Sequence, residues 1–306
     1  MLRRTILAAS RNDRVKALVS RAPVSRSVVA RFVAGESQDD AVRTARELEG
    51  AGLAVTLDRL GEDVLEPAQA RATVDAYVSL LGALADVGLT AGGRCEVSVK
   101  LTAVGQAFDE ALALDGARRV CEAAQRAGTT VTLDMEDHTT TDSTLGVLRQ
   151  LREDFPSTGA VVQAYLHRTE ADCRDLAHEG SRVRLCKGAY DEPAAVAFQD
   201  PDEVSASYVR CLEVLFGGGG YPMVATHDPA MVEAAERLAA GRDPGSYEFQ
   251  MLYGIRPKEQ QRLAGEGRTV RVYVPYGDEW YGYLMRRLAE RPANVAFFLR
   301  ALASRS

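Results

Sequence analysis

The sequence predicts an α/β fold, a (β/α)8 TIM-like barrel preceded by an N-terminal helical arm. After Gly52, short β-branched runs alternate with longer amphipathic stretches. Eight such runs can be counted, at residues 53–58, 95–101, 129–136, 160–166, 182–190, 221–228, 247–254 and 269–277. Strands that alternate with helices favour parallel βαβ units, and eight units are the number that closes a barrel. An open doubly wound sheet is the alternative, although no GxGxxG motif follows the first strand to support it.

Helix-patterned segments separate the runs, for example residues 66–88, 109–128 and 228–241. The first fifty residues also have a helical pattern, which ends in the acidic, cap-like stretch ESQDD. No linker rich in proline, glycine or serine divides the chain after this point. We therefore predict two parts, a helical arm at residues 1–50 and a barrel domain at residues 51–306.

The composition is that of an ordinary globular chain, with 306 residues, 46% of them hydrophobic, and a net charge of −6. This acidic balance argues against a nucleic-acid partner. The five cysteines form no CxxC pair, which indicates free thiols in a reducing cytoplasm. The opening MLRRTILAASRNDR contains an apolar run too short for a signal peptide or a membrane span. We expect a cytoplasmic protein that begins with a helix.

Polar side chains occupy one face of the predicted strands. Because successive strand residues point to opposite faces, each run can be divided into an apolar set and a polar set. The apolar set should meet the outer helices and contains Val99, Leu101, Leu133, Val162, Ala164, Val183, Leu185, Val272 and Val274. The polar set contains Ser98, Lys100, Asp134, Glu136, Gln163, Tyr165, Arg182, Arg184, Gln250, Arg271 and Tyr273. We place this second set at the carboxyl ends of the strands, where barrels have their active sites; a closed network of ion pairs, such as Lys100 with Asp134, is the alternative.

The residue types at this mouth favour an anionic organic ligand. None of the four histidines forms an HxH or HExxH pair, so we predict no metal site. What remains is a cationic set with aromatic neighbours: Lys100, Arg184, Lys187, Tyr190, Tyr273, Arg286 and Arg287. Such a set could hold an anionic substrate and stabilise a reduced flavin anion. It fits equally well an aldolase-type barrel that forms a Schiff base on Lys100 or Lys187.

Two adjacent arginines near the end of the chain, Arg286 and Arg287 in YGYLMRRLAERPAN, have two interpretations. Neighbouring residues on a helix point about 100° apart, so one of the pair would normally face solvent. Glu290 lies four residues after Arg286 and three after Arg287, which is the spacing of a surface ion pair. Alternatively, both guanidinium groups converge on one small carboxylate.

Taken together, the motifs resemble those of the proline dehydrogenase family of flavin-dependent barrel enzymes. The resembling blocks are VSVKLTAVG, TLDMED, QAYLHR, VRLCKGAY, VATHD, EFQMLYG and VYVPYGDEWYGYLMRRLAERPAN, in the family's order and over residues 50 to 300. No aldehyde dehydrogenase domain follows, so the chain is similar to the short monofunctional bacterial type. Cys186 and Tyr253 depart from the residues common in the longer bifunctional members.

The resemblance implies a role for each matching position. It implies a last helix across the barrel mouth, from which Arg286 and Arg287 would hold the substrate carboxylate together with Lys100, while Glu290 supports one arginine. Tyr273 and Leu252 would flank the substrate ring. Asp134 and Arg184 are the implied catalytic residues, with Asp134 near the ring nitrogen and Arg184 near flavin N5. The other implied cofactor-binding residues are Met135, Gln163, Lys187, Gly188, Ala189, Thr226 and His227.

The implied reaction is oxidation of L-proline to Δ1-pyrroline-5-carboxylate, with hydride passing to noncovalent FAD and electrons then to a membrane quinone. Because the sequence shows no membrane anchor, contact with the inner face of the membrane would be peripheral. A related activity on hydroxyproline or another cyclic imino acid stays open, and Leu252, Tyr273 and Tyr276 would decide it. A catalytically inactive ligand-binding regulator is a third alternative.

Overall fold

The computed structural model describes residues 29–61 and 64–290. Its centre is one sheet of eight strands: β1 (Ala54–Arg59), β2 (Cys95–Val99), β3 (Val131–Leu133), β4 (Ala160–Gln163), β5 (Arg182–Cys186), β6 (Tyr221–Ala225), β7 (Glu248–Leu252) and β8 (Val270–Tyr276). Each of the eight predicted runs overlaps one of these strands; β1 extends one residue beyond its run, and the other seven strands end earlier than predicted. In β5, for example, the extended backbone ends at Cys186 rather than at residue 190.

All neighbouring strands pair in parallel, in the order β3-β2-β1-β8-β7-β6-β5-β4. The two ends of this order meet beside Gly159, which precedes β4. Gly159 donates its N–H to Val131 O at 2.8 Å and accepts from Leu133 N at 2.9 Å. The sheet is therefore a nearly closed barrel, and the predicted (β/α)8 fold is confirmed.

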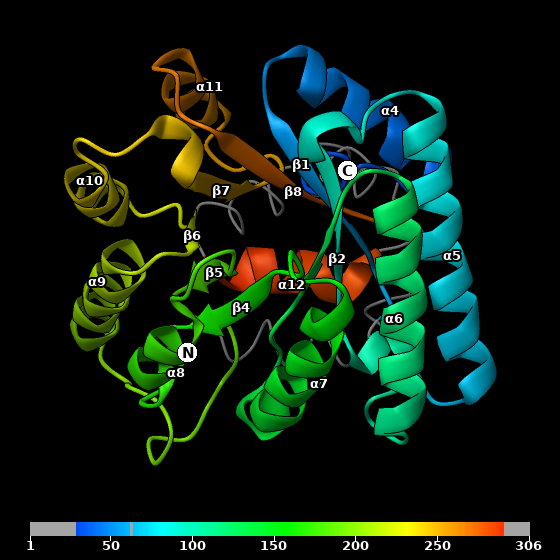
Figure 1. The fold of residues 1–306 in the computed structure, drawn as a ribbon, viewed down its shortest axis with the longest axis horizontal. Coiled ribbons are helices and arrows are strands. Elements are labelled where there is room, and N and C mark those ends of the chain that lie inside the picture. Colours follow the sequence, from blue (N-terminus) through cyan, green and yellow to red (C-terminus); the bar gives the residue numbers. More distant parts are fainter. Residues whose placement is uncertain (1–28, 62–63, 291–306) are drawn as a thin grey trace, which may run out of the picture.

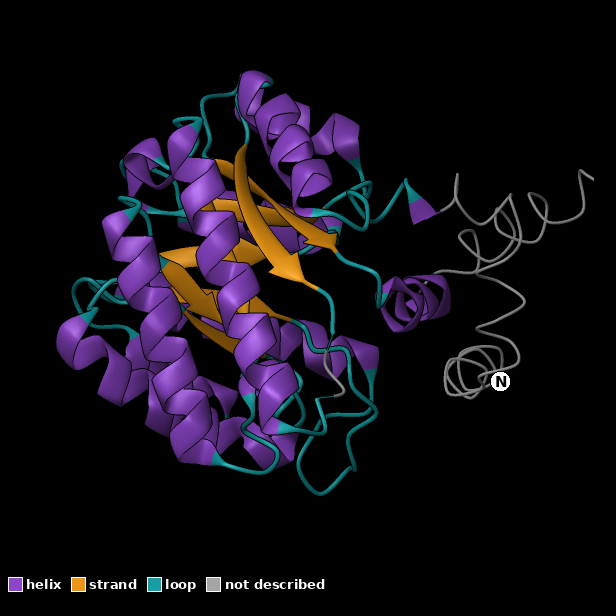
Figure 2. Ribbon diagram, turned by 90° about the vertical axis from the view of Figure 1, so that its right-hand side faces the viewer, coloured by secondary structure: helices purple, strands orange, loops and turns teal. Residues whose placement is uncertain are grey.

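Helices surround the barrel (Figures 1 and 2). They are α4 (Gln38–Gly50), α5 (Pro67–Asp86), α6 (Glu110–Arg126), α7 (Thr141–Asp154), α8 (Thr169–Leu176), α9 (Pro201–Gly217), α10 (Pro229–Leu238), α11 (Pro257–Gly265) and α12 (Trp280–Glu290). Aspartate side chains accept from backbone N–H groups at the start of three of them, Asp109 for α6, Asp200 for α9 and Asp228 for α10. These caps satisfy N–H groups that a helix start leaves without partners, and so they fix where the helices begin.

The main hydrophobic core lies between the strands and these helices. It includes every residue that the strand pattern assigned to the outer face, from Val99 to Val274. Ala41 and Ala45 of α4 belong to the same core, so this helix packs directly on the barrel, beside β1 and β8. Residues 1–28 of the predicted arm, including the predicted first helix, lie outside the described residues. The boundary between arm and barrel at residue 50 stays a prediction.

The last described helix, α12, crosses the end of the barrel, as predicted (Figure 1). It rests on a second hydrophobic cluster, in which Trp280 and Leu284 pack with Leu60 and with Phe32 and Val33 of the chain before α4. This cluster holds α12 over the mouth, where Tyr283 and Arg287 face the barrel. In the part of the chain that the structure describes, no helix combines the length and apolar composition needed to span a membrane.

Candidate active site

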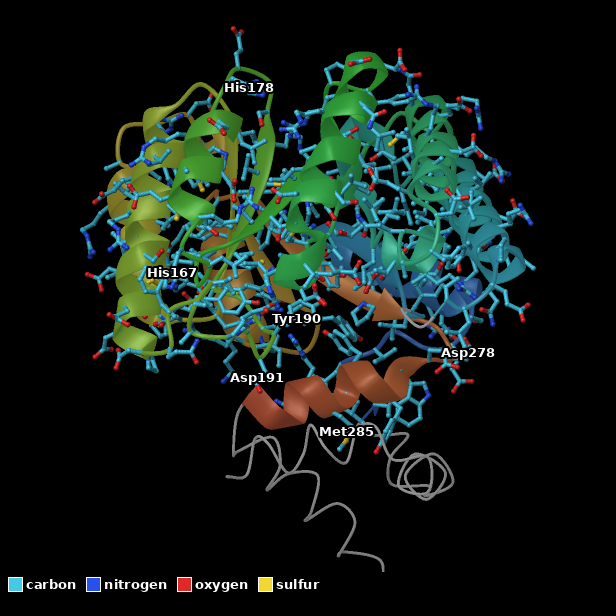
Figure 3. The ribbon with its side chains drawn as sticks, turned by 90° about the horizontal axis from the view of Figure 1, so that it is seen from below. His167, His178, Tyr190, Asp191, Asp278 and Met285 are labelled. Carbon is cyan, nitrogen blue, oxygen red and sulfur yellow. The ribbon has the colours of Figure 1, made fainter. Side chains whose placement is uncertain are left out.

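A cavity of about 450 Å³ lies at the carboxyl ends of the strands, under α12. The terminal residues of four strands line it, Gln163 of β4, Cys186 of β5, Ala225 of β6 and Leu252 of β7. In Figure 3, Tyr190 lies between α12 and the barrel, whereas Met285 is on the opposite side of the helix. The cavity therefore has the position of an active site in a (β/α)8 barrel.

The cavity collects most of the predicted site residues. Those in its lining are Lys100, Asp134, Met135, Gln163, Arg184, Lys187, Gly188, Ala189, Thr226, His227, Leu252, Tyr273 and Arg287. The backbone of Arg286 and Glu290 belongs to α12, but their side chains lie outside what the structure describes. Several lining residues were missed from the sequence, namely Asp58, Val161, Ala225, Asp228, Met251 and Tyr283.

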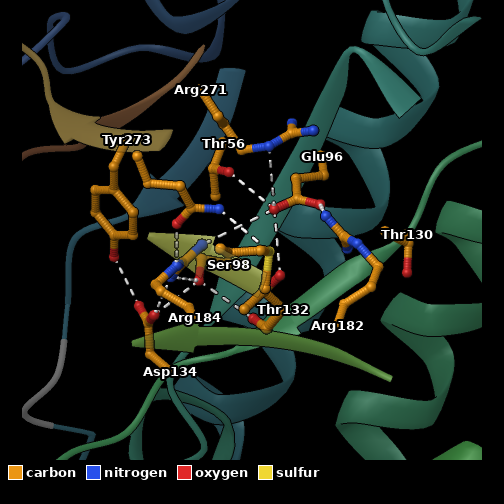
Figure 4. A network of polar contacts seen from close by, with 12 residues as sticks. Thr56, Glu96, Ser98, Thr130, Thr132, Asp134, Arg182, Arg184, Arg271 and Tyr273 are labelled. Carbon is orange, nitrogen blue, oxygen red and sulfur yellow. Dashed lines mark hydrogen bonds and ion pairs between the residues drawn. The ribbon is translucent and has the colours of Figure 1, made fainter. Parts of the chain in front are cut away.

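Asp134 is the centre of the polar contacts in the cavity (Figure 4). It directly follows β3, so its side chain leaves the strand at the mouth. Its Oδ1 accepts from Ser98 Oγ at 2.8 Å and from Arg184 Nη1 at 2.7 Å. Its Oδ2 accepts from the Tyr273 hydroxyl at 2.6 Å and from Lys100 Nζ at 3.4 Å. The predicted Lys100–Asp134 ion pair is present, as part of a larger network.

These contacts determine the ionisation of Asp134. Burial by itself would raise the pKa of this carboxyl, but the charges of Lys100 and Arg184 and the hydrogen bonds of Tyr273 and Ser98 outweigh it and lower the pKa. Asp134 is therefore a stable carboxylate, held by two cations and two hydroxyl groups. Such a group can orient a substrate cation, but it is a poor proton acceptor.

Arg184, in the middle of β5, is fixed on several sides. Its Nε donates to Gln250 Oε1 at 2.6 Å, its Nη1 donates to Ser98 Oγ at 3.0 Å, and its guanidinium lies 5.2 Å from the centre of the Tyr273 ring. Burial would lower the pKa of Arg184, but Asp134 and Glu96 more than offset this and raise it. The result is a permanent, immobile positive charge in the floor of the cavity.

Lys100, which follows β2, bonds most closely to a residue that the sequence reading missed. Its Nζ donates to Asp58 Oδ2 at 2.9 Å and to the Tyr273 hydroxyl at 3.3 Å. Asp58 is near the carboxyl end of β1 and is 1% exposed. The rule that found Asp134 would also have found Asp58, because the first run, LAVTLD, ends on this aspartate.

A second layer of charges lies deeper in the barrel, and here the sequence reading was wrong. Arg182 is the first residue of β5 and Arg271 the second of β8, so neither is at the carboxyl end of its strand. Arg182 Nη2 donates to Glu96 Oε2 at 2.8 Å (Figure 4). Arg271 Nε donates to Glu248 Oε1 at 2.8 Å. The strand pattern correctly predicted that these arginine side chains point into the barrel, but not how far they lie from its mouth.

This deeper layer is a closed ion-pair network around Glu96, which is fully buried. Burial alone would raise the pKa of Glu96, but Arg182, Arg271 and Arg184 bring it down to about 2. Arg184 Nη2 lies 3.8 Å from Glu96 Oε1 and so joins this network to the cavity above. The alternative interpretation of the polar residues, a structural network, is thus correct for the lower layer.

The chain after β5 forms one wall of the cavity. Lys187 Nζ donates to Asp228 Oδ2 at 2.7 Å and to Ser205 Oγ at 2.8 Å, which ties this wall to the start of α10 and to α9. Gly188 has φ of +115°, and a Cβ there would come within 2.2 Å of the Tyr165 ring. The family resemblance implied only that this glycine binds the cofactor, where a missing Cβ would let the backbone approach a ligand closely. The structure gives a different reason, because the backbone already packs against Tyr165.

The adjoining wall contains the ends of β6 and β7. His227 Nε2 accepts from Leu252 N at 2.9 Å, and Thr226 Oγ1 accepts from Asp228 N at 3.1 Å. Together with Met251, these residues present an apolar surface edged by polar atoms. On the roof, the Arg287 guanidinium lies 5.0 Å from the centre of the Tyr283 ring, and Arg287 is 9% exposed.

In the described residues, no group of three or more histidine, cysteine, aspartate or glutamate side chains is arranged to hold a metal ion. The cavity instead combines buried guanidinium and ammonium groups with carboxylates, aromatic rings and apolar side chains. A nearly closed barrel with this kind of mouth has the architecture of a barrel enzyme that binds a small charged organic molecule.

Comparison with known proteins identifies the family. A family model described as proline dehydrogenase matches residues 41–300, and the chain belongs to this family. Proline dehydrogenase 1 of Bacillus subtilis (strain 168) is 40% identical over 304 residues, which is 99% of each chain. The proline dehydrogenase of Deinococcus radiodurans is 42% identical over 279 residues, 89% of each chain. The chain is therefore an oxidoreductase, and the family resemblance read from the motifs is confirmed.

Solved structures give the same fold. Proline utilization A (PutA) from Bdellovibrio bacteriovorus, inactivated by N-propargylglycine, matches with a TM-score of 0.81 and 25% identity. The match covers 94% of this chain but 36% of that protein, so the chain spans about a third of its length. A mutant PutA from Bradyrhizobium japonicum matches with a TM-score of 0.74 and 23% identity, which shows the fold alone.

Proposed function

We propose that this chain oxidises L-proline to Δ1-pyrroline-5-carboxylate, the first step of proline catabolism, with FAD as cofactor and a membrane quinone as the final electron acceptor. The observation that carries the proposal is the convergence of Lys100, Asp134, Arg184 and Tyr273 in one cavity under Arg287. Proline is a small zwitterion, and this cavity offers cations for its carboxylate and a stable carboxylate for its ring nitrogen. Membership of the family supports the same substrate.

The residues of the cavity fit a bound flavin. A flavin ring system needs apolar contacts on its faces and polar or cationic groups at its edge. The apolar contacts would come from Met251, Leu252 and Val161. The polar and cationic groups would be Gln163 and the immobile guanidinium of Arg184. FAD would supply the hydride acceptor, and Arg184 would favour its reduced, anionic state electrostatically. Lys187 and the chain at Thr226 and His227 would hold other parts of the cofactor.

The substrate would bind between the flavin and α12. Arg287, together with Arg286 and Lys100, would hold the proline carboxylate; a planar guanidinium can bind a carboxylate through two hydrogen bonds. Tyr273 and Leu252 would flank the ring and exclude water from C5. The lowered pKa of Asp134 supports its role beside the ring nitrogen, because an ionised carboxylate attracts the substrate ammonium.

The aldolase alternative fits the structure less well. A lysine that forms a Schiff base must be neutral when it attacks. Lys100 bonds to two carboxylates, those of Asp58 and Asp134, and Lys187 bonds to Asp228. Attack by either lysine would therefore require these ion pairs to break first.

Anaerobic addition of substrate to the purified protein tests the proposal. L-proline should bleach the flavin absorbance, and hydroxyproline added to a second sample should show whether the site accepts a hydroxyl group on the ring. A colourless protein that is trapped on lysine by borohydride in the presence of a carbonyl substrate would overturn the proposal in favour of an aldolase. A flavin that no cyclic imino acid reduces would support a ligand-binding regulator instead.

The cofactor should be noncovalent. Acid precipitation should release FAD into the supernatant, because the cavity offers ionic and hydrogen-bonding groups to hold it. Flavin that remains in the pellet would refute the noncovalent attachment.

A further inference from the structure

Asp58 is a carboxylate of the cavity to which no role has yet been given. It lines the cavity from β1, it is 1% exposed, and its Oδ2 accepts from Lys100 Nζ at 2.9 Å. This distance is shorter than the 3.4 Å from the same Nζ to Asp134 Oδ2. Lys100 therefore connects two carboxylates and is bonded more closely to the deeper one.

The two carboxylates differ in what donates to them. Asp134 accepts from Ser98, Arg184, Tyr273 and Lys100, so both of its oxygens are fully used. Oδ1 of Asp58 has the Tyr77 hydroxyl at 3.5 Å, but that hydroxyl lies closer, 2.8 Å, to Ser98 O. Fewer donors reach Asp58, and no arginine pairs with it among the described residues.

The electrostatics agree with this difference in geometry. Burial raises the pKa of Asp58, and the charge of Asp134 adds to this rise. The charge of Lys100 and the hydrogen bonds of Lys100 and Tyr273 oppose the rise but do not cancel it. The pKa of Asp134 moves in the opposite direction. Two neighbouring carboxyl groups whose pKa values are driven apart commonly divide the roles of proton acceptor and fixed charge.

Oxidation of proline requires such an acceptor. In neutral solution the ring nitrogen is a protonated ammonium and has no lone pair to donate. Hydride can leave C5 only if this lone pair is free to form the C=N bond, so one proton must be lost from nitrogen in each turnover. Asp134 is poorly suited to take it, since two cations and two hydroxyl groups stabilise its ionised form.

We propose that Asp58 receives the amine proton of the substrate through Lys100, an inference that rests on the proposed function. The substrate N–H bond breaks as its proton moves to Lys100 Nζ, while Lys100 passes one of its own protons to Asp58 Oδ2. The freed lone pair forms the C=N bond as hydride leaves C5 for the flavin oxidant. The products are the protonated cyclic imine, a two-electron-reduced flavin and a neutral Asp58. Asp58 receives the proton from Lys100 and does not contact the substrate itself, so it acts as a positioning residue.

The charged and titratable groups around Asp58 come from its own strand, β1, and from four other elements or the residues that follow them. They are Lys100 after β2, Asp134 after β3, Tyr77 of α5, and Tyr273 and Tyr276 of β8, with Arg59 as the next residue in β1. Burial raises the pKa of all three tyrosines, so they stay neutral near neutral pH. The groups that can exchange a proton there are Lys100 and the two carboxyls.

Difference infrared spectroscopy of the flavin-loaded enzyme tests the assignment directly. Anaerobic reduction with proline should produce the C=O stretch of a protonated carboxyl group, which shifts in D2O. This band should be absent in Asp58→Asn and displaced in Asp58→Glu. It should also be absent when dithionite reduces the wild-type flavin, because no amine proton is then released. A proline-reduced wild-type spectrum without the band overturns the proposal, even if Asp58→Asn does not fold.

Rapid-mixing kinetics provide a second readout, which a purely structural role would not change. Asp58→Asn should slow flavin reduction by proline at pH 7 on the order of a hundredfold, and the loss should diminish at higher pH. With a 4-fluoroproline as substrate, Asp58→Asn should slow flavin reduction clearly less. Fluorine makes the ring nitrogen less basic, so its proton leaves more easily without the acceptor. Asp109→Asn is the matched control, since asparagine also caps a helix and Asp109 caps α6 far along the chain.

The possible results separate this inference from the proposed function. If proline does not reduce the flavin of the wild-type enzyme, the proposed function itself fails. The wild-type enzyme could react while Asp58→Asn slows flavin reduction by the same factor with proline and with 4-fluoroproline at every pH. In that case Asp58 has only a structural role, and the proton acceptor is another group.

Discussion

Arg184 Nη1 donates to Asp134 Oδ1 at 2.7 Å, and both residues are buried. The pair links the two layers of charge in the barrel, because Arg184 also lies 3.8 Å from Glu96 in the lower layer. Asp134 is stabilised as a carboxylate by Arg184, and Arg184 is immobilised by Asp134 and Gln250. The geometry of the cavity floor therefore depends on a network that extends below the cavity.

Replacing Arg184 should make the bound flavin harder to reduce. Arg184→Ala removes a buried positive charge, which we expect to cost the reduced anionic flavin ~2 kcal/mol, or about 40 mV for a two-electron couple. Redox titration of the purified variant measures this change, and flavin content measures any loss of binding. Arg184→Lys should lower the potential less, since it retains the charge. A potential equal to that of the wild type in Arg184→Ala would exclude Arg184 from this role.

Acid should destabilise the barrel through Glu96. A fall in its pKa from the ordinary 4.5 to about 2 corresponds to ~3 kcal/mol of stability. Because the pKa is lower in the folded state, this stability is fully present above pH 4.5 and is lost as the pH falls towards 2. Urea unfolding at several pH values in this window should show the free energy of unfolding decreasing.

The matched variant for this prediction is Glu96→Gln, which cannot titrate. It should be less stable than the wild type at pH 6, because three arginines lose their shared carboxylate. Its free energy of unfolding should also depend less on pH between 4.5 and 2. Parallel pH profiles for the two proteins would mean that other carboxyl groups account for the acid sensitivity.

The strand pattern predicted the fold and the faces of the side chains, but not every partner. The period of two in CEVSVKL was enough to assign Val99 to the core and Lys100 to the mouth. The same period does not indicate how far a side chain lies from the mouth of the barrel, because this distance depends on the stagger between strands. Arg182 and Arg271 were therefore predicted at the carboxyl ends of their strands, although they lie near the amino ends. Asp58 could have been placed at the mouth by the same period, but its pairing with Lys100, 42 residues later, could not be read from that period.

Gly188 should tolerate no side chain. Its φ of +115° is unfavourable for alanine, and a Cβ would meet the Tyr165 ring. We expect Gly188→Ala to lose at least ~3 kcal/mol of stability, measured by urea unfolding, and to lose flavin. Gly180→Ala is the control, because Gly180 has φ of +77° with no atom within 4 Å of the added Cβ. It should cost only about 1–2 kcal/mol, the strain of the left-handed backbone alone. Equal losses in the two variants would show that the contact with Tyr165 is unimportant.

The adjacent arginines of α12 provide the sharpest test of the substrate site. Arg287 is buried in the cavity lining, which is not the position of a solvated surface arginine. If Arg286 and Arg287 hold one carboxylate, truncating either leaves that charge poorly compensated. We expect Arg286→Ala and Arg287→Ala to lose ~2–4 kcal/mol, roughly thirtyfold to a thousandfold in kcat/KM for proline, with the flavin spectrum intact.

Two comparisons separate carboxylate binding from helix packing. Arg287→Lys keeps the charge but not the planar pair of donors, so it should recover only part of the activity that Arg287→Ala loses. Pyrrolidine, which lacks the carboxylate, should react poorly with the wild-type enzyme and lose little more in either alanine variant. If the arginines only form a solvated helix face, each alanine change should cost under ~0.5 kcal/mol and affect stability rather than kcat/KM. Near-wild-type proline kinetics in both alanine variants would assign the pair to that surface role.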